Sequence, residues 1–172
     1  MRRVRYGVGM SLDAFIADPQ GGTGFLIPDP DYDSGPFFAS IDTVLMGRKT
    51  FEVAGKQSYP GLRTYVFSRT LRSEDFPGVT IVSAEDTAST VVALRAEEGK
   101  DIWLCGGGEL CGSLLEAGLV DTVEVGLCPI LLGQGVPLVA HLPRAARLEL
   151  VEHQVYRSGM ITLTYAVRRE EA

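Results

Sequence analysis

Two stretches of the sequence join a short apolar run to residues that can hold phosphate. The first run, residues 43–46, is followed by Gly47, Arg48, Lys49 and Thr50. The second run, residues 102–105, is followed by Gly106, Gly107 and Gly108. Each pattern predicts a buried strand that leads into the first turn of a helix, where unpaired N–H groups and the helix dipole favour an anion. Two such positions in one small chain predict a diphosphate ligand, most simply a dinucleotide.

A third polar turn, Ser68-Arg69-Thr70, ends the strand-like run 64–68. Ligands collect at the carboxyl ends of parallel strands, so this turn could hold the 2′-phosphate that separates NADP from NAD. The alternative is an ordinary surface turn. For Arg48 and Lys49 the alternative is a helix start whose cationic side chains merely face water. That is less natural, because cations are disfavoured near the positive end of a helix dipole unless an anion lies between them.

The glycine triplet was tested against the Rossmann fingerprint. Cys111 occupies the position of the last glycine, and Glu124 lies within the next strand instead of at its end. The triplet also follows several strands, whereas the fingerprint opens its domain. The sequence therefore favours a glycine-rich turn that approaches a diphosphate outside a Rossmann unit, with a tight turn that binds nothing as the alternative.

The elements that must position these residues alternate along the chain. Strand-like runs cover Val4–Met10, 43–46, 64–68, Val79–Val82, 102–105 and Thr122–Leu127. Helical patterns cover 48–54, 86–98 and 109–118, with one more expected between residues 31 and 40. The tail holds two strand-length runs, 148–156 and 160–168, joined by a hairpin-length loop. The sequence predicts one α/β domain over residues 1–172, with a mixed sheet that is parallel first and ends in an antiparallel hairpin.

Composition narrows the function classes. A net charge of −6 argues against a nucleic-acid binder that relies on a basic face. No apolar run has the length of a membrane span, and no signal region follows Arg2 and Arg3, so we expect a cytoplasmic protein. Three cysteines and two late histidines show no metal-ligand spacing, so we expect no metal site.

Five motifs in order give the chain a family resemblance. They begin at Ser11 (SLDAFIA), Met46 (MGRKTFE), Tyr65 (YVFSRT), Ile102 (IWLCGGGEL) and Pro129 (PILLGQG). Together they resemble the dihydrofolate reductase-like superfamily, and most closely stand-alone relatives of the C-terminal reductase domain of the bifunctional riboflavin-biosynthesis deaminase-reductase. The resemblance runs from about Val4 to Arg168 and implies a three-layer fold, with helices on both faces of the sheet.

The resemblance implies NADPH as cofactor and hydride transfer to a heterocyclic or sugar-derived small molecule, such as 5-amino-6-(5-phosphoribosylamino)uracil. It implies cofactor binding by fourteen residues: Ile16, Ala17, Gly47, Arg48, Lys49, Thr50, Ser68, Arg69, Thr70, Gly106, Gly107, Gly108, Glu109 and Leu110. Relatives are often dimers, and the run 119–132 with the final hairpin offers apolar strand surface for a homodimer.

The candidates for a proton donor and for substrate contacts lie within the first 40 residues. Asp13 borders the active site in riboflavin-type relatives and is the predicted donor, provided that partial burial raises its pKa. Phe25, Asp33 and Phe37 are the predicted substrate contacts. Cys105 stands where riboflavin-type reductases carry an acidic residue, which leaves a non-catalytic NADP(H)-binding module open as an alternative. A dihydrofolate reductase proper is the other alternative.

Overall fold

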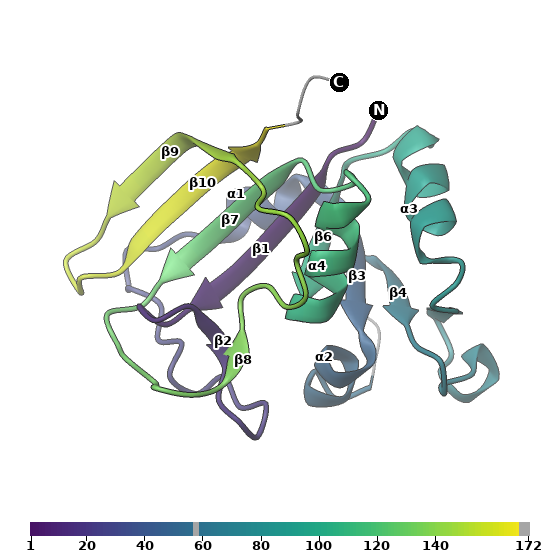
Figure 1. The fold of residues 1–172 in the computed structure, drawn as a ribbon, viewed down its shortest axis with the longest axis horizontal. Coiled ribbons are helices and arrows are strands. Elements are labelled where there is room, and N and C mark those ends of the chain that lie inside the picture. Colours follow the sequence, from purple (N-terminus) through teal and green to yellow (C-terminus); the bar gives the residue numbers. More distant parts are fainter. Residues whose placement is uncertain (57–58, 169–172) are drawn as a thin grey trace.

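The fold is built on one twisted sheet of eight strands in the order β5-β4-β3-β6-β1-β7-β10-β9 (Figure 1). The computed structural model describes residues 1–56 and 59–168. The strands are β1 (Val4–Met10), β3 (Ile41–Gly47), β4 (Arg63–Phe67), β5 (Val79–Val82), β6 (Asp101–Gly106), β7 (Thr122–Leu127), β9 (Leu148–Val155) and β10 (Ile161–Val167). From β5 to β7 all neighbours are parallel, and β10 and β9 follow antiparallel. The predicted mixed sheet and terminal hairpin are confirmed.

Helices lie on both faces of this sheet. They are α1 (Gly35–Ala39), α2 (Arg48–Val53), α3 (Thr87–Ala96) and α4 (Gly108–Glu116). In Figure 1, α3 and α4 cover the near face, and α1 lies behind the sheet. The near-face core contains Tyr6, Leu104 and Leu114, and the far-face core contains Phe51 and Trp103. Each fully buried apolar side chain of this size contributes about 1.5–3 kcal/mol relative to leaving it in water.

The predicted elements match the observed ones within a few residues, and the differences lie at the ends of helices and strands. The helix predicted over 86–98 ends at Ala96, because Glu97 is already extended. Asp86 makes no side-chain capping bond; its carboxylate instead accepts a hydrogen bond of 2.7 Å from the Ser83 hydroxyl. Within the described residues, no helix is both long and apolar enough to cross a bilayer.

A second, two-stranded sheet was not predicted. It pairs β2 (Phe15–Ala17) with β8 (Val136–Pro137), and the 3-10 turn η1 (Ser73–Asp75) was also not predicted. These elements are too short to show a sequence period. Their pairing depends on Gly135, where a Cβ atom would lie 2.2 Å from the Ala17 carbonyl oxygen and φ is +158°. The pairing fixes the loop after β1 beside the carboxyl edge of the main sheet.

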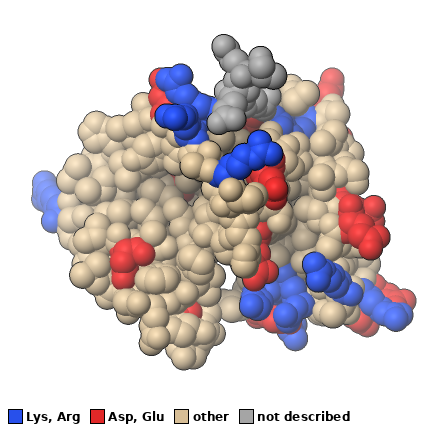
Figure 2. Space-filling view, in the orientation of Figure 1, with Lys and Arg blue, Asp and Glu red and all other residues tan. Residues whose placement is uncertain are grey.

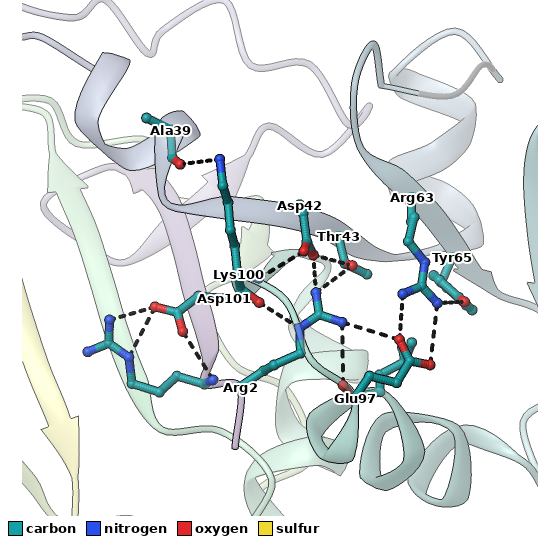
Figure 3. Close-up of polar contacts among 11 residues, drawn as sticks. Arg2, Ala39, Asp42, Thr43, Arg63, Tyr65, Glu97, Lys100 and Asp101 are labelled. Carbon is teal, nitrogen blue, oxygen red and sulfur yellow. Dashed lines mark hydrogen bonds and ion pairs between the residues drawn. The ribbon is translucent and has the colours of Figure 1, made fainter.

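The opposite, amino edge of the sheet is held by a network of charged side chains around Arg2 (Figure 3). Arg2 is 4% exposed, and its guanidinium donates to the Asp42 carboxylate, to Thr43 Oγ1 at 2.7 Å and to the Lys100 carbonyl at 2.6 Å. Gly99 is required beside it, because a Cβ there would lie 2.6 Å from the Asp42 carboxylate. The buried cation therefore links the chain before β1 to β3 and β6.

Helix α4 approaches the segment after β8 so closely that side chains are excluded. A Cβ on Gly112 would lie 2.1 Å from the Ala140 carbonyl oxygen, and one on Gly108 would lie 2.5 Å from the Pro137 carbonyl oxygen. The Ala140 N–H donates to the Gly108 carbonyl at 3.0 Å. The start of α4 is thus fixed against the backbone that carries β8.

We predict that Gly112→Ala destabilises the protein by about 1–3 kcal/mol, because the added methyl group overpacks a backbone contact. Inside an ordinary helix, a change from glycine to alanine stabilises the protein by about 1 kcal/mol. The sign of the change in the free energy of unfolding therefore distinguishes the close backbone contact from an ordinary helix position. Urea denaturation measures the difference. Gly24→Ala is the matched control, since a Cβ there meets nothing within 4 Å. A stabilised Gly112→Ala protein would contradict the close packing.

Candidate active site

The two predicted phosphate-binding stretches lie side by side. Strands β4, β3 and β6 are neighbours and end at the same edge, the lower edge in Figure 1. A Cβ on Gly47 would lie 3.8 Å from the Gly107 nitrogen. A Cβ on Gly107 would lie 3.6 Å from Thr50 Oγ1, and a Cβ on Gly106 would lie 3.8 Å from Ile16 Cδ1. The fold therefore joins both stretches and the loop after β1 into one surface.

The two helices that start here offer different chemistry to an anion. Gly107 caps α4 in an extended conformation without a side-chain hydrogen bond, so the first amide groups of this nine-residue helix receive no side-chain cap. Helix α2 has only six residues, so its dipole is weak. Arg48 is paired with Glu52 at 2.8 Å, and Lys49 is exposed. On the α2 side, anion binding must therefore come from side chains.

The Ser68-Arg69-Thr70 turn borders the same edge. The buried Ser68 hydroxyl accepts hydrogen bonds of 3.1 Å from the Thr70 and Leu71 N–H groups, which shapes the turn and leaves Arg69 exposed. A cavity of about 810 Å³ opens beside it. Its lining comprises Ser68, Arg69, Leu71, Ser73, Ile81, Ser83, Ala84 and Glu85. Lys and Arg side chains gather around α2 and this turn at the lower right of Figure 2.

A cleft of about 2120 Å³ runs along the carboxyl edge and continues over β1, β7 and the β9–β10 hairpin. Fifteen of the predicted site residues line it: Ile16, Ala17, Asp33, Phe37, Gly47, Arg48, Lys49, Thr50, Ser68, Arg69, Thr70, Gly107, Gly108, Glu109 and Leu110. Gly106 is buried directly behind them, with a φ of +125° that favours glycine. Its peptide bond to Gly107 is cis.

Phe25 does not line this cleft; its neighbour Leu26 does. The Leu26 side chain covers the sheet at Gly9, where a Cβ would lie 2.9 Å from Leu26 Cδ2. The sequence prediction favoured the aromatic residue because a ring can stack on a flat substrate. In a segment without regular secondary structure, no period indicates which of two adjacent side chains faces the site.

Asp13 does not have the environment of a proton donor, and it lies outside the cleft lining. Its carboxylate accepts hydrogen bonds from the Ser11 hydroxyl at 2.6 Å, from the Gly133 N–H at 2.7 Å and from the Leu132 N–H. These donors, led by Ser11, lower the pKa of Asp13 from 3.8 to about 2. The sequence hypothesis needed a raised pKa, whereas the structure gives an ionised carboxylate that ties the loop after β1 to residues 132–133.

Several lining residues were not predicted, and the most prominent are Arg5 and Glu124. Arg5 Nε and Nη2 each donate to a Glu124 oxygen at 2.7 Å. Both side chains lie on the cleft face of the sheet in line with glycines, since Gly7 pairs with Glu124 and Gly9 with Gly126. The alternation of Arg5, Gly7 and Gly9 along β1 was the available signal. Its partner on β7 could be identified only once the register was known.

Cys105, at the end of β6, lies in the cleft beside Tyr59 and Trp103. Burial raises the pKa of the Cys105 thiol to about 12, and burial also raises the pKa of the Tyr59 hydroxyl, which contacts the sulfur, to about 12. Both groups are therefore protonated at neutral pH, and the thiol is no nucleophile. Within the described residues, no group of three or more His, Cys, Asp and Glu side chains could hold a metal ion.

Comparison with known proteins agrees with this geometry. A profile of the RibD C-terminal domain matches residues 2–162. The YyaP protein of Bacillus subtilis strain 168 is 32% identical over 179 residues, covering 95% of this chain and 94% of YyaP. A Shewanella sp. PV-4 protein with a provisional assignment to riboflavin biosynthesis superposes with a TM-score of 0.77 at 26% identity, over 98% of this chain and 100% of that one.

A further solved structure is dihydrofolate reductase from Enterococcus faecalis complexed with NADP(H) and RAB-propyl. It has a TM-score of 0.71 at 16% identity, over 97% of both chains. The sheet, its helical layers and the carboxyl-edge cleft thus define a protein of dihydrofolate reductase-like fold. Within that class, the chain belongs to the RibD C-terminal domain family, which supports a reductase-like function.

We predict that Asp13→Asn loosens the loop that the carboxylate holds. Because the folded-state pKa lies below the ordinary value of 3.8, the carboxylate stabilises the fold above about pH 4 and loses that effect as the pH falls towards 2. The variant should melt at a lower temperature than the wild type at pH 7, and this gap in melting temperature should narrow below about pH 4. Hydrogen exchange at Leu132 and Gly133 should quicken. An unchanged gap from pH 7 to pH 3 would refute this assignment.

Proposed function

We propose that this protein is an NADPH-dependent reductase that transfers a hydride to a small heterocyclic or sugar-derived molecule. The observation that carries the proposal is the single cleft that joins the cationic edge at α2 and the Ser68 turn to a pocket over β1 and β7. Membership of the RibD C-terminal domain family supports it, as does the shared fold of a dihydrofolate reductase that binds NADP(H).

The chain's own residues fit a dinucleotide along the edge. The pyrophosphate would lie between Thr50 and the uncapped start of α4 at Gly107, where two glycine-bearing strand ends leave room for it. Arg69 and Thr70 would hold the 2′-phosphate, and Ile16 and Ala17 would border the nicotinamide. NADPH supplies the hydride when bound, and the protein aligns the acceptor and excludes water. Asp13 would act as a positioning residue through its hold on loop residues 132–133.

Two alternatives were open from the sequence. The non-catalytic module is kept open by Cys105, which is a neutral thiol and supplies no acid or base at neutral pH. NADPH oxidation against a panel of pyrimidine, pterin and carbonyl compounds distinguishes it from an enzyme. A dihydrofolate reductase proper has less support. In folate reductases an arginine after a proline-glycine pair grips the folate tail, whereas here Leu62 follows Pro60-Gly61 and is partly buried against the core. Arg63, one position further on, is paired with Glu97 at 2.5 Å near the amino edge (Figure 3). Neither is available to grip a folate tail.

We further propose a homodimer through the near face of β9 and β10. Leu150 and Val155 are 49% and 62% exposed, and they share that face with their partners Tyr165 and Ile161. Figure 2 shows few charged side chains on this side, and no helix covers it in Figure 1. Sedimentation velocity should give a dimer that Leu150→Glu dissociates. A monomeric wild type would remove this proposal. The cytoplasmic location stays a prediction.

We predict that Arg69→Ala weakens NADPH binding by about 10–100-fold, which is the value of one charged hydrogen bond to a phosphate. NADH binding should hardly change, because NADH lacks the 2′-phosphate. Fluorescence titration of both cofactors measures the effect.

Arg72→Ala is the matched control, because Arg72 is exposed, is paired with Glu74 and does not line the cleft. Equal losses for NADPH and NADH in Arg69→Ala would contradict the 2′-phosphate assignment. Glu85 also lines the cavity beside Arg69. We expect Glu85→Gln to strengthen the binding of NADPH, since it removes a charge that repels the 2′-phosphate.

A further inference from the structure

The charged residues of the cleft are divided unevenly between its two ends. We call the part lined by residues 47–54, 67–70 and 107–113 the cofactor half, and the part lined by β1, β7, β9, β10 and residues 26–40 the substrate half. Among the described lining residues, the cofactor half holds three of the four cations, Arg48, Lys49 and Arg69, and two acidic side chains, Glu52 and Glu109. The substrate half holds one cation, Arg5, and three acidic side chains, Asp33, Glu124 and Glu152.

The one cation of the substrate half is already committed. Two Arg5 nitrogens bind the two oxygens of Glu124 at 2.7 Å each, and the third donates to Ser40 Oγ at 2.5 Å and lies 3.7 Å from Asp101. The guanidinium carbon lies 4.7 Å from the centre of the Phe37 ring. Capture of a phosphate by Arg5 would break a two-point charged pair that is largely withdrawn from water, which is costly.

The acidic residues, in contrast, retain capacity to accept hydrogen bonds. One Glu124 oxygen accepts from Arg5 and from Thr122 Oγ1 at 2.7 Å, while the other accepts only from Arg5. A carboxylate offers about four acceptor positions, so Glu124 can still bind an N–H group of a ligand. Glu152 is exposed on β9 and points to the same face, since it pairs with Thr164 across the hairpin. The hydroxyls of Thr162 and Thr164 add neutral donors and acceptors.

Aromatic rings bound the substrate half on two sides. Trp103 packs edge-to-face with Phe37 and Phe38 at ring distances of 5.8 and 5.5 Å, and Tyr32 packs against Tyr156 at 5.9 Å. Burial raises the pKa of Tyr32, and the charges of Tyr156, Glu124 and Asp33 raise it further, so Tyr32 lies near these two carboxylates. Between these walls Gly126 leaves the sheet open, since a Cβ there would meet only Gly9 Cα at 4.0 Å. The space suits a flat ring.

We infer that the substrate half selects a planar, uncharged or cationic molecule that presents N–H groups and carries no phosphate. This inference rests on the proposed reductase function and narrows its substrate. It departs from the phosphoribosyl substrate that the family resemblance implies, because such a substrate would bring a dianion to Asp33, Glu124 and Glu152.

The test is a matched pair of planar probes, riboflavin and flavin mononucleotide, which share one ring system with an N–H donor and differ by one phosphate. Flavin fluorescence is titrated with protein that is saturated with NADP⁺, and again with protein that is saturated with inorganic pyrophosphate in place of NADP⁺. In both titrations the cofactor half is filled, so that the phosphate of flavin mononucleotide cannot bind there. We expect riboflavin to bind at least about tenfold more tightly, from the repulsion of a dianion by nearby carboxylates.

Variants test whether the preference for riboflavin over flavin mononucleotide comes from the carboxylates of the substrate half. Glu152→Gln should narrow the difference between the probes, and Glu124→Gln, which releases Arg5, should narrow it more. Glu116→Gln, the same change at the end of α4 on the other face of the sheet, should leave it unchanged. Glu152 is exposed, so its substitution keeps the test valid should Glu124→Gln fail to fold.

Equal or tighter binding of flavin mononucleotide would overturn the inference, especially if Arg157→Ala abolished it, because Arg157 follows the lining residue Tyr156 in the hairpin turn and is a cation outside the lining. Failure of both probes to bind would also overturn it. Failure of the proposed function has a different signature: no NADP⁺ binding and no NADPH oxidation, while the pyrophosphate arm still reports the probe preference.

Discussion

The site depends on the contact between the ends of β3 and β6, where two strands far apart in the sequence finish side by side without side chains between them. Gly47 and Gly107 lie next to each other, since a Cβ on Gly47 would be in van der Waals contact, at 3.8 Å, with the Gly107 nitrogen. Because parallel neighbours end at one edge, this contact brings the starts of α2 and α4 together. A side chain at either position would occupy the space that we propose for the pyrophosphate of the cofactor.

The two edges of the sheet use charge in opposite ways. At the amino edge, Arg2 is buried and bound by Asp42, Thr43 and the Lys100 carbonyl, which fixes the chain before β1 against β3 and β6 (Figure 3). At the carboxyl edge, Lys49 and Arg69 are exposed and line the cleft. Arg2 is thus bound within the protein, while the exposed Lys49 and Arg69 can meet a ligand. The same contrast separates Arg5, committed to Glu124, from these two cations.

Much of this arrangement could be predicted from the sequence, because local patterns determine it. The two-residue period of Ile161–Val167 and the apolar runs before Gly47 and Gly106 predicted the strands, and the strand ends predicted that the two glycine-bearing stretches meet at one edge of the sheet. The rest depends on contacts between distant segments. The low pKa of Asp13 needs the N–H groups of residues 132–133, and the Arg5–Glu124 pair needs the β1–β7 register. The choice of Leu26 over Phe25 needs the path of an irregular loop.

The most direct test of the account is a crystal structure of the protein with NADP⁺. The account predicts the pyrophosphate between Thr50 and the first amide groups of α4, the 2′-phosphate within hydrogen-bonding distance of Arg69, and the nicotinamide beside Ile16, with the space over Gly126 left for substrate. NADP⁺ bound elsewhere, or reversed so that its adenine lies beside Ile16, would contradict it.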